Sequence, residues 1–328
     1  MWRFVRMSRI EKKLEFYEDK KVLITGSSGL LGSYLLDLIG AHAREIRVLS
    51  RKPATGYRNR IKNIQGDITK GTDTDKIVKD IDIIFHLAAI VNIDKSIRDP
   101  FNTIDANVMG TINLLESVRK ERNKPHIIFS SSASIYGVSK VKIITEDHTL
   151  APSNPYSASK AAADMICQAY NKTYDIPITI LRPSTLYGLR QRRTQFIPTV
   201  ILQCLSSDTL EIGSLDAYRD FCYVKDAASA FVLAGATAEA KGQVFNISGG
   251  LSINVADIVR KISEILRKEV KIIAKKNFYR PCEITSPFVI DSSKAKKILG
   301  WVPRYDIDSG LKETVEYFRS SPNKFLKT

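Results

Sequence analysis

The chain lacks the features of several large classes of protein. Its apolar runs stay well below the roughly 18 residues that a membrane-spanning helix needs, so no membrane span is expected. The four cysteines, at positions 167, 204, 222 and 282, form no CxxC pair, and the four histidines, at positions 42, 86, 126 and 148, have no ligand spacing. These absences argue against a disulfide framework and a metal site, and they favour a reducing, cytoplasmic location.

Acidic residues are scarce relative to basic ones. The 328 residues include 50 lysines and arginines against 35 aspartates and glutamates, which gives a net charge of +15. The basic residues are spread along the chain and form no recognised nucleic-acid module, so a solvated basic surface is favoured and no nucleic-acid partner is expected. A nucleic-acid-binding protein is a weak alternative, which predicts steeply salt-dependent association.

What the chain does contain is a glycine-rich turn near its N-terminus. The apolar run Val22-Leu23-Ile24 predicts a buried strand, and Leu30 to Ile39 has helical apolar spacing. Between them the sequence TGSSGLLG has G-x-x-G-x-x-G spacing. At such a strand-to-helix turn, backbone N–H groups and the positive end of the helix can hold the diphosphate of a dinucleotide. The residues predicted to bind it are Gly26, Ser28, Gly29, Leu30, Leu31 and Gly32.

The end of the second predicted strand, Glu45 to Leu49, bears on which dinucleotide is bound. In such sites a carboxylate at this position binds the ribose 2′-hydroxyl, whereas an arginine accommodates a 2′-phosphate. Here Ser50, Arg51 and Lys52 follow the strand, and no acid occurs before Asp67. Two cations and a hydroxyl suit a 2′-phosphate, so NADP is favoured over NAD. If Arg51 and Lys52 merely begin a basic surface loop, NAD is the alternative.

Strands alternate with helices along the first half of the chain, which predicts a parallel, doubly wound sheet. Further strands are expected at 61–68, 81–87 and 126–129, and one long helix over 101–121. Ligands bind at the carboxyl ends of such strands. His86 is expected to be a packing residue. The residues expected to line the cofactor site at these ends are Asp67, Ile68, Leu87, Ala88, Ala89 and Ser130.

A second motif, Pro155-Tyr156-Ser157-Ala158-Ser159-Lys160, opens a helix predicted to reach Tyr174. Tyr156 and Lys160 are four residues apart and share one helix face. A phenol beside an ammonium has its ionised form favoured, so we expect a lowered pKa for Tyr156. Such a tyrosine exchanges a proton with a sugar or alcohol hydroxyl while hydride moves at the attached carbon, and Ser132 is a candidate to hold the same oxygen. The pair alone has little specificity, but the preceding glycine turn and strands favour the catalytic interpretation.

These motifs resemble those of the extended short-chain dehydrogenase/reductase family, which includes nucleotide-sugar epimerases, dehydratases and reductases. The resemblance covers Lys21 to about Arg319. The matching segments are TGSSGLLG (25–32), HLAA (86–89), NVMGT (107–111), SSSASIYG (130–137), YSASK (156–160), RPSTLYG (182–188), RDFCYVKD (219–226) and LGWVP (299–303).

The resemblance implies catalytic roles for individual residues. Tyr156 would be the acid/base, and Lys160 would lower its pKa and bind the cofactor ribose. Ser132 would hold the substrate oxygen. Asn107 would belong to a supporting polar relay beside the cofactor. The resemblance also implies a homodimer formed through the helices that contain Asn107 and Tyr156.

For the ligands, the resemblance implies that Pro183 lines the cofactor site and that Thr185 contacts the substrate. Arg219 and Arg280 would bind the substrate diphosphate, whose oxygens suit an arginine fork. The family usually has asparagine where this chain has Thr185, which places the detail of diphosphate binding in question.

Two further departures from the family pattern bear on the reaction. The dehydratases have Thr-Asp-Glu where this chain has Ser132-Ala133-Ser134. Without that acid pair, 4,6-dehydration is not expected. The acid that ends the second strand in the NAD-using epimerases is absent, as described above.

The pattern changes after Arg182, where shorter strands and helices follow. We expect an N-terminal extension over 1–20, a dinucleotide-binding domain over 21–182, and mainly a substrate-binding lobe over 183–328, with the strand and helix near 221–249 returning to the first domain. Ile10, Leu14 and Tyr17 share helical spacing, so the extension contains either a docked helix or a frayed end.

The sequence therefore predicts an α/β protein with a Rossmann-type, doubly wound parallel sheet and a smaller interlaced C-terminal substrate lobe. The predicted activity is hydride transfer at C4 of a nucleoside-diphosphate sugar, with an NADP-dependent 4-keto-sugar reductase as the first hypothesis. An NAD-dependent 4-epimerase is the alternative. A non-catalytic, NADP-sensing binding protein is a third hypothesis, and the intact Ser132, Tyr156 and Lys160 argue against it.

Overall fold

The computed structural model describes residues 10–51, 61–139, 141–275 and 283–320. Its centre is a seven-stranded sheet in the order β11-β7-β5-β4-β1-β2-β3, in which every neighbouring pair is parallel. This confirms the predicted doubly wound α/β fold. The strands are β1 (Lys21–Thr25), β2 (Glu45–Ser50), β3 (Ile61–Gln65), β4 (Ile83–His86), β5 (His126–Ser130), β7 (Ile178–Pro183) and β11 (Val244–Ile247).

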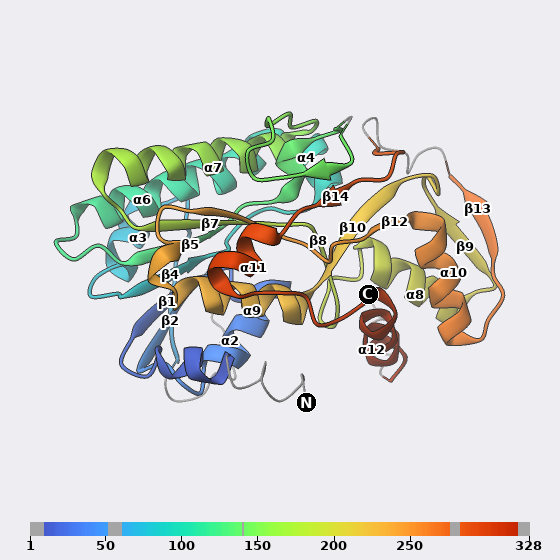
Figure 1. Cartoon of the computed structure of the whole chain (residues 1–328), viewed down its shortest axis with the longest axis horizontal. Coiled ribbons are helices and arrows are strands. Elements are labelled where there is room, and N and C mark those ends of the chain that lie inside the picture. Colours follow the sequence, from blue (N-terminus) through green and yellow to red (C-terminus); the bar gives the residue numbers. More distant parts are fainter. Residues whose placement is uncertain (1–9, 52–60, 140, 276–282, 321–328) are drawn as a thin grey trace.

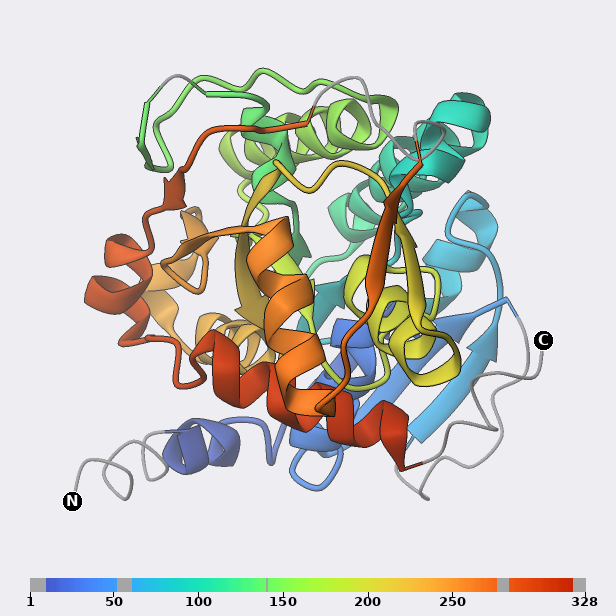
Figure 2. The same cartoon turned by 90° about the vertical axis from the view of Figure 1, so that its right-hand side faces the viewer.

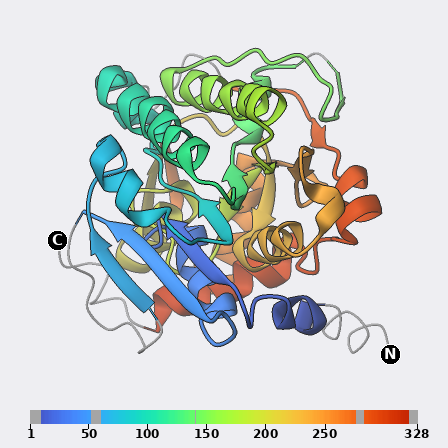
Figure 3. The ribbon, with the colours of Figure 1, turned by 90° about the vertical axis from the view of Figure 1, so that its left-hand side faces the viewer.

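Helices cover both faces of this sheet, and their apolar sides form its two core layers (Figure 1). Figure 3 shows α6 and α7 on one side of the sheet and α9 on the other. The central strands are buried on both faces; Val22, Leu23 and Ile24 of β1 have no exposed surface. The covering helices are α2 (Leu30–Ile39), α3 (Gly71–Ile77), α6 (Gly110–Lys120), α7 (Pro155–Tyr174) and α9 (Val224–Gly235).

A smaller lobe with its own apolar core lies at one end of the sheet (Figure 2). It contains a three-stranded sheet in the order β12-β10-β8 and a two-stranded sheet, β13-β9, whereas a further two-stranded sheet, β14-β6, packs in a separate small cluster with α7. Its strands are β8 (Thr185–Tyr187), β9 (Thr209–Ile212), β10 (Tyr218–Tyr223), β12 (Ser252–Asn254) and β13 (Lys271–Ala274). The pair β6 (Ile143–Ile144) and β14 (Val289–Ile290) joins distant parts of the chain. The accompanying helices are α8 (Phe196–Ser206), α10 (Val255–Leu266) and α12 (Ile307–Arg319), whereas α11 (Ser293–Leu299) packs against β11 and α9 in the core of the main sheet.

The helix predicted over 101–121 is not continuous. The structure divides it into α5 (Pro100–Ile104), a π-helical turn (Asp105–Met109) and α6, and a short helix α4 (Ile93–Arg98) precedes them. Asn107 lies in the π-helical turn, where its side chain binds backbone groups of Ile90. Helical periodicity alone does not reveal this insertion, because the contacts that accompany it come from another segment.

The N-terminal segment docks on the main sheet layer rather than fraying. Residues 10–15 are helical, and Tyr17 is fully buried. The Tyr17 hydroxyl donates to the Val232 carbonyl at 2.8 Å, and the Lys13 ammonium donates to the Ala236 carbonyl at 2.6 Å. Both carbonyls belong to the C-terminal end of α9, where unpaired carbonyls and the negative end of the helix favour a cation.

Substituting Tyr17→Phe should therefore lower the free energy of unfolding by about 1 kcal/mol, because the ring still packs but one buried hydrogen bond is lost. Urea unfolding measures the change. The neighbouring Phe16, which is 40% exposed, provides a control, and Phe16→Leu should change stability less. Equal effects at both positions would contradict the docked arrangement.

The remaining sequence expectations concern core residues and side-chain clusters. His86 is buried between the Thr25 and Thr111 hydroxyls, at 2.8 and 3.0 Å, as expected of a packing residue. Cys167, Cys204 and Cys222 are free thiols, and Cys282 lies outside the described residues. Within residues 10–51, 61–139, 141–275 and 283–320, no group of His, Cys, Asp or Glu is arranged to hold a metal ion. Across those same ranges, no helix has both the length and the apolar character that a membrane crossing requires.

Candidate active site

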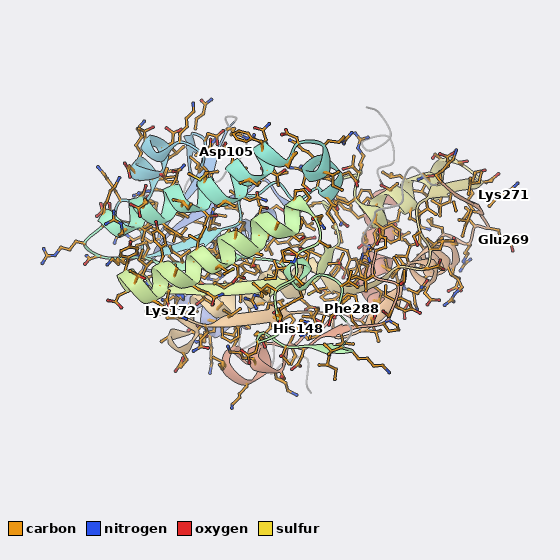
Figure 4. All side chains as sticks on the ribbon, turned by 90° about the horizontal axis from the view of Figure 1, so that it is seen from above. Asp105, His148, Lys172, Glu269, Lys271 and Phe288 are labelled. Carbon is orange, nitrogen blue, oxygen red and sulfur yellow. The ribbon has the colours of Figure 1, made fainter. Side chains whose placement is uncertain are left out.

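A cavity of 1390 Å³ lies at the carboxyl ends of the parallel strands, between the main sheet and the smaller lobe. Figure 4 labels two of its lining residues, Asp105 from the helical layer and Phe288 from the segment before β14. Lys52 and Arg280 lie outside the described residues. The predicted site residues that line the cavity are Gly26, Ser28, Gly29, Leu30, Leu31, Gly32, Ser50, Arg51, Asp67, Ile68, Leu87, Ala88, Ala89, Ser130, Ser132, Tyr156, Lys160, Pro183, Thr185 and Arg219.

The glycine turn fits a dinucleotide diphosphate. Gly26 has a φ of +75°, and a Cβ there would lie 2.7 Å from the Ala88 nitrogen; a Cβ on Gly32 would lie 2.3 Å from the Gly26 oxygen. The first turn of α2 contains no acid, and no side chain caps its N–H groups. Backbone donors at the positive end of a helix are thus left for an anion. The buried Ser131 hydroxyl in the cavity wall also has no partner within the described parts of the chain.

The end of β2 presents Ser50 and Arg51 to the cavity, as the sequence predicts. The Ser50 hydroxyl donates to the Asn63 side chain at 2.9 Å, and Arg51 is exposed. The carboxylate of Asp67 lies after β3 and accepts from both the N–H and the hydroxyl of Thr69, each at 3.1 Å. The residue that follows β2 is therefore a cation rather than a carboxylate.

Local sequence signals fix Tyr156 at the start of α7. Pro155 occupies the first turn, and the Asn154 side chain accepts the Ser157 N–H at 2.9 Å in a capping box. The Tyr156 N–H donates to the Ser96 hydroxyl of α4 at 3.2 Å. The helix therefore begins where the sequence predicts, and a contact from another segment holds the backbone of the tyrosine itself.

The charge state of the Tyr156 and Lys160 pair differs from the sequence expectation. Burial raises the pKa of Tyr156, and a hydrogen bond with Ser132 opposes this rise without reversing it. Burial also lowers the pKa of Lys160 to about 8, and its ammonium lies 4.7 Å from the centre of the Phe129 ring. The predicted lowering of the Tyr156 pKa by Lys160 is thus wrong for this structure, because the loss of solvation on burial outweighs the hydrogen bond with Ser132.

A pair of hydroxyls occupies the position where dehydratases of this type carry acids. The Ser132 and Ser134 oxygens are 2.9 Å apart, and the Ser132 hydroxyl accepts the Ser134 N–H at 3.2 Å. Both serines and Ala133 line the cavity. Neither a carboxylate nor another strong acid is available at these positions to protonate a leaving hydroxyl.

Among the predicted site residues that the structure describes, Asn107 is the one that does not line the cavity. It is 2% exposed, and its side-chain oxygen accepts the Ile90 N–H at 2.7 Å. Its nitrogen donates to the Ile90 carbonyl at 3.0 Å and to the Ser159 hydroxyl at 2.9 Å. Asn107 therefore does not line the cavity itself but binds the backbone of Ile90, which does, so its predicted role beside the cofactor is an indirect one in this structure.

On the substrate-lobe side, Arg219 forms an ion pair with Glu283 and donates to the Tyr218 carbonyl at 2.8 Å. Sequence reasoning did not include Glu283, because the two residues are 64 positions apart. It also missed several residues that line this wall, because their segments carry no motif signal or because the motif that contains them did not single them out. These residues are Ser134, Ser184, Gln191, Arg192, Gln195, Asp220 and Phe288.

Comparison with known proteins identifies the family. The sequence model described as GDP-mannose 4,6 dehydratase matches residues 23–314. The chain belongs to this family of extended short-chain dehydrogenases/reductases. It is therefore an NAD(P)-dependent enzyme of the nucleotide-sugar epimerase/dehydratase type, and both the predicted family and the predicted fold are confirmed.

Relatives within the family carry several different names. The chain is 30% identical to a low-salt glycan biosynthesis protein of Haloferax volcanii, over 90% of this chain and 98% of that protein. It is 29% identical to a putative UDP-glucose 4-epimerase of Methanocaldococcus jannaschii, with 92% and 99% covered. A Bacillus cereus UDP-glucuronic acid 4-epimerase, solved with UDP-glucuronic acid and NAD, has 29% identity and a TM-score of 0.83 over 92% of this chain and 99% of its own. Family membership therefore establishes a nucleotide-sugar epimerase or dehydratase type of enzyme. Which reaction this chain catalyses depends on the residues of its own active site.

Proposed function

We propose that this protein is a 4-epimerase of nucleoside-diphosphate sugars. The observation that carries the proposal is the composition of the cavity around Tyr156. It combines Ser132, Tyr156 and Lys160 with a dinucleotide cradle, and it has Ala133 and Ser134 in place of an acid pair. This set suits oxidation and reduction at one sugar carbon but supplies no group for eliminating water. The epimerases among its relatives support a UDP-sugar as the first substrate to test.

The residues divide the chemistry between them. A bound nicotinamide dinucleotide would supply the hydride acceptor and donor. Tyr156 takes the proton of the C4 hydroxyl as hydride leaves C4, and Ser132 holds the same oxygen. Lys160 binds the cofactor ribose. The resulting 4-keto sugar turns within the cavity, accepts hydride at the opposite face of C4, and recovers the proton from Tyr156.

The test is to identify the dinucleotide released from the purified protein and to assay turnover without added cofactor. We expect tightly bound NAD and interconversion of UDP-glucose with UDP-galactose, or of the corresponding uronic acids, because the cofactor is regenerated in each cycle. Failure to epimerise any UDP- or dTDP-sugar after cofactor loading would contradict the proposal.

A second candidate, an NADP-dependent 4-keto-sugar reductase, is favoured by one observation, the exposed Arg51 at the end of β2. If NADP is the cofactor, Arg51→Ala should weaken NADP binding by about 10- to 100-fold, which corresponds to the loss of a hydrogen bond to a charged group, and should change NAD binding little. Titration with both cofactors measures this. Lys62→Ala on the neighbouring β3 is the control, since Lys62 pairs with Glu45 and does not line the cavity. Equal losses for NAD and NADP would mean that Arg51 does not select the cofactor.

The protein is further proposed to form a homodimer. Four large apolar side chains are 44–78% exposed on α5, the π-helical turn and α7, which pack against one another: Phe101, Ile104, Met109 and Met165. An exposed apolar patch of this kind is typical of a protein interface. Light scattering should give twice the 36.8 kDa mass of the chain, and Phe101→Glu with Met165→Lys should give the monomer mass. A monomeric wild-type protein would contradict this assembly.

A further inference from the structure

We propose that Asp220 is a positioning residue for substrate binding, because its carboxylate joins the strands that present Arg219 to the substrate diphosphate. This inference rests on the proposed function, since it takes a nucleoside-diphosphate sugar as the ligand. Asp220 lies in β10 and lines the cavity, yet it is only 1% exposed.

The Asp220 carboxylate binds three segments that are distant in sequence. One oxygen accepts the Ser248 hydroxyl at 2.6 Å and the Ile290 N–H at 3.1 Å. The other accepts the Gly249 N–H at 3.1 Å. Ser248 and Gly249 follow β11 of the main sheet, whereas Ile290 belongs to β14. One side chain therefore connects the substrate lobe to the main sheet and to the C-terminal segment.

The turn after β11 approaches β10 closely enough that this connection leaves little freedom. A Cβ on Gly249 would lie 2.0 Å from the Phe221 carbonyl oxygen. On its other edges, β10 pairs Phe221 with Thr185 of β8 and Asp220 with Ser252 of β12. The backbone around Asp220 is thus packed against β8, β12 and the turn after β11, and the carboxylate binds that turn directly.

Arg219 and its partner Glu283 lie next to the segments that the Asp220 carboxylate joins, which we call the Asp220 junction. Arg219 immediately precedes Asp220 on β10, and Glu283 lies in the segment that leads to β14. The Tyr218 N–H donates to the Ile284 carbonyl at 2.7 Å beside this pair, and Asp220 adds a second tie between β10 and the same segment by accepting the N–H of Ile290 in β14. A diphosphate that binds Arg219 must meet the guanidinium in this position, so loss of the junction should weaken diphosphate binding.

The junction requires an ionised carboxylate. Each oxygen of Asp220 faces a backbone N–H, from Gly249 or from Ile290, and an N–H cannot accept a hydrogen bond. Protonation of either oxygen therefore opposes one of these contacts. Burial raises the pKa of Asp220 to about 6, while the Ser248, Ile290 and Gly249 hydrogen bonds oppose the rise. Arg219 and Glu283 on adjoining segments pair with each other, and burial together with the Asp220 carboxylate raises the pKa of the Cys222 thiol on the same strand.

Asp226 provides a matched control for Asp220→Asn. It is 2% exposed, burial raises its pKa to about 6, and it accepts the N–H groups of Arg304 and Tyr305, each at 2.9 Å. Asp226 does not line the cavity. A purely structural carboxylate should therefore behave like Asp226, losing stability without a specific loss of substrate affinity.

The experiment is calorimetric titration of the cofactor-loaded protein with UDP-glucose and with dTDP-glucose at pH 7.5. We expect Asp220→Asn to weaken binding of the better ligand about tenfold and to raise KM more than it lowers kcat, while Asp226→Asn stays within about twofold of wild type. Unchanged affinity in Asp220→Asn, or equal losses in both variants, would overturn the inference. If the wild-type protein binds neither sugar nucleotide, the proposed function itself fails. If wild type binds one of them and Asp220→Asn binds it equally well, only the role of Asp220 fails.

The pH dependence gives an independent readout. Both phosphates of these probes are esterified, so they lack the terminal phosphate that titrates near pH 6. Wild-type affinity should fall as the pH drops through about 6, and the Asp220→Asn affinity should not. Stability should respond in the opposite sense, because a carboxyl whose pKa is raised on folding favours the folded state more at low pH. If Asp220→Asn does not fold, Ser248→Ala should move the affinity midpoint to higher pH, and an unmoved midpoint would overturn the inference.

Discussion

Replacing Tyr156 by phenylalanine should lower kcat by about 10²- to 10⁴-fold, the range typical of a lost general acid/base. The expectation follows from the position of its hydroxyl, which forms a hydrogen bond with Ser132, and Tyr156 is the only tyrosine among the described residues that line the cavity. The backbone of Tyr156 is held by the Ser96 hydroxyl and by α7, so the substitution should leave the site otherwise intact. Steady-state kinetics with the preferred sugar nucleotide provides the measurement.

The control for this substitution is Tyr170→Phe. Tyr170 lies on the same helix, donates to Glu116 at 2.7 Å, and does not line the cavity. We expect its kcat to remain near the wild-type value. Cofactor affinity should be nearly unchanged in Tyr156→Phe. If Tyr156→Phe turned over substrate as fast as Tyr170→Phe, the assigned acid/base role would be untenable.

The sequence predicted those parts of the site that depend on local chain chemistry. The glycine turn is recognisable because Gly26 and Gly32 occupy positions where a side chain would collide with backbone atoms. The start of α7 is recognisable because Asn154 and Pro155 are strong helix-start residues. Since strands and helices alternate, these signals were sufficient to predict the sheet and to place the ligand at its carboxyl edge.

The parts that escaped prediction depend on contacts between distant segments. The π-helical turn at Asn107 accompanies hydrogen bonds to Ile90, and the Arg219 ion pair requires Glu283. The direction of the Tyr156 pKa shift depends on burial, which the four-residue spacing to Lys160 does not reveal. Asp220 lies within a recognisable motif, but its function follows only from the three segments that its carboxylate joins.

The largest stability effect is expected at the buried ion pair between Arg182 of β7 and Asp164 of α7. The guanidinium binds both oxygens of Asp164, at 2.9 and 3.0 Å, and also donates to the Tyr136 hydroxyl and the Glu146 carbonyl. The side chains are 4% and 0% exposed. Arg182→Met would leave the buried carboxylate with Gln168 as its remaining hydrogen-bond donor, so the free energy of unfolding should fall by about 3–5 kcal/mol.

Urea denaturation at unchanged m-value tests this expectation. Arg260→Met is the matched surface control, because Arg260 pairs with Asp257 and Glu264 on the exposed face of α10 and its loss should cost less than about 1 kcal/mol. The double variant Arg182→Met with Asp164→Leu should recover much of the loss, since it removes the uncompensated charge as well. A loss at Arg182 no larger than that at Arg260 would show that the pair does not hold the catalytic helix to the sheet. In that case the position of Lys160, one turn before Asp164 on the same helix, would have to depend on other contacts of α7, such as the hydrogen bond between Asn107 and Ser159.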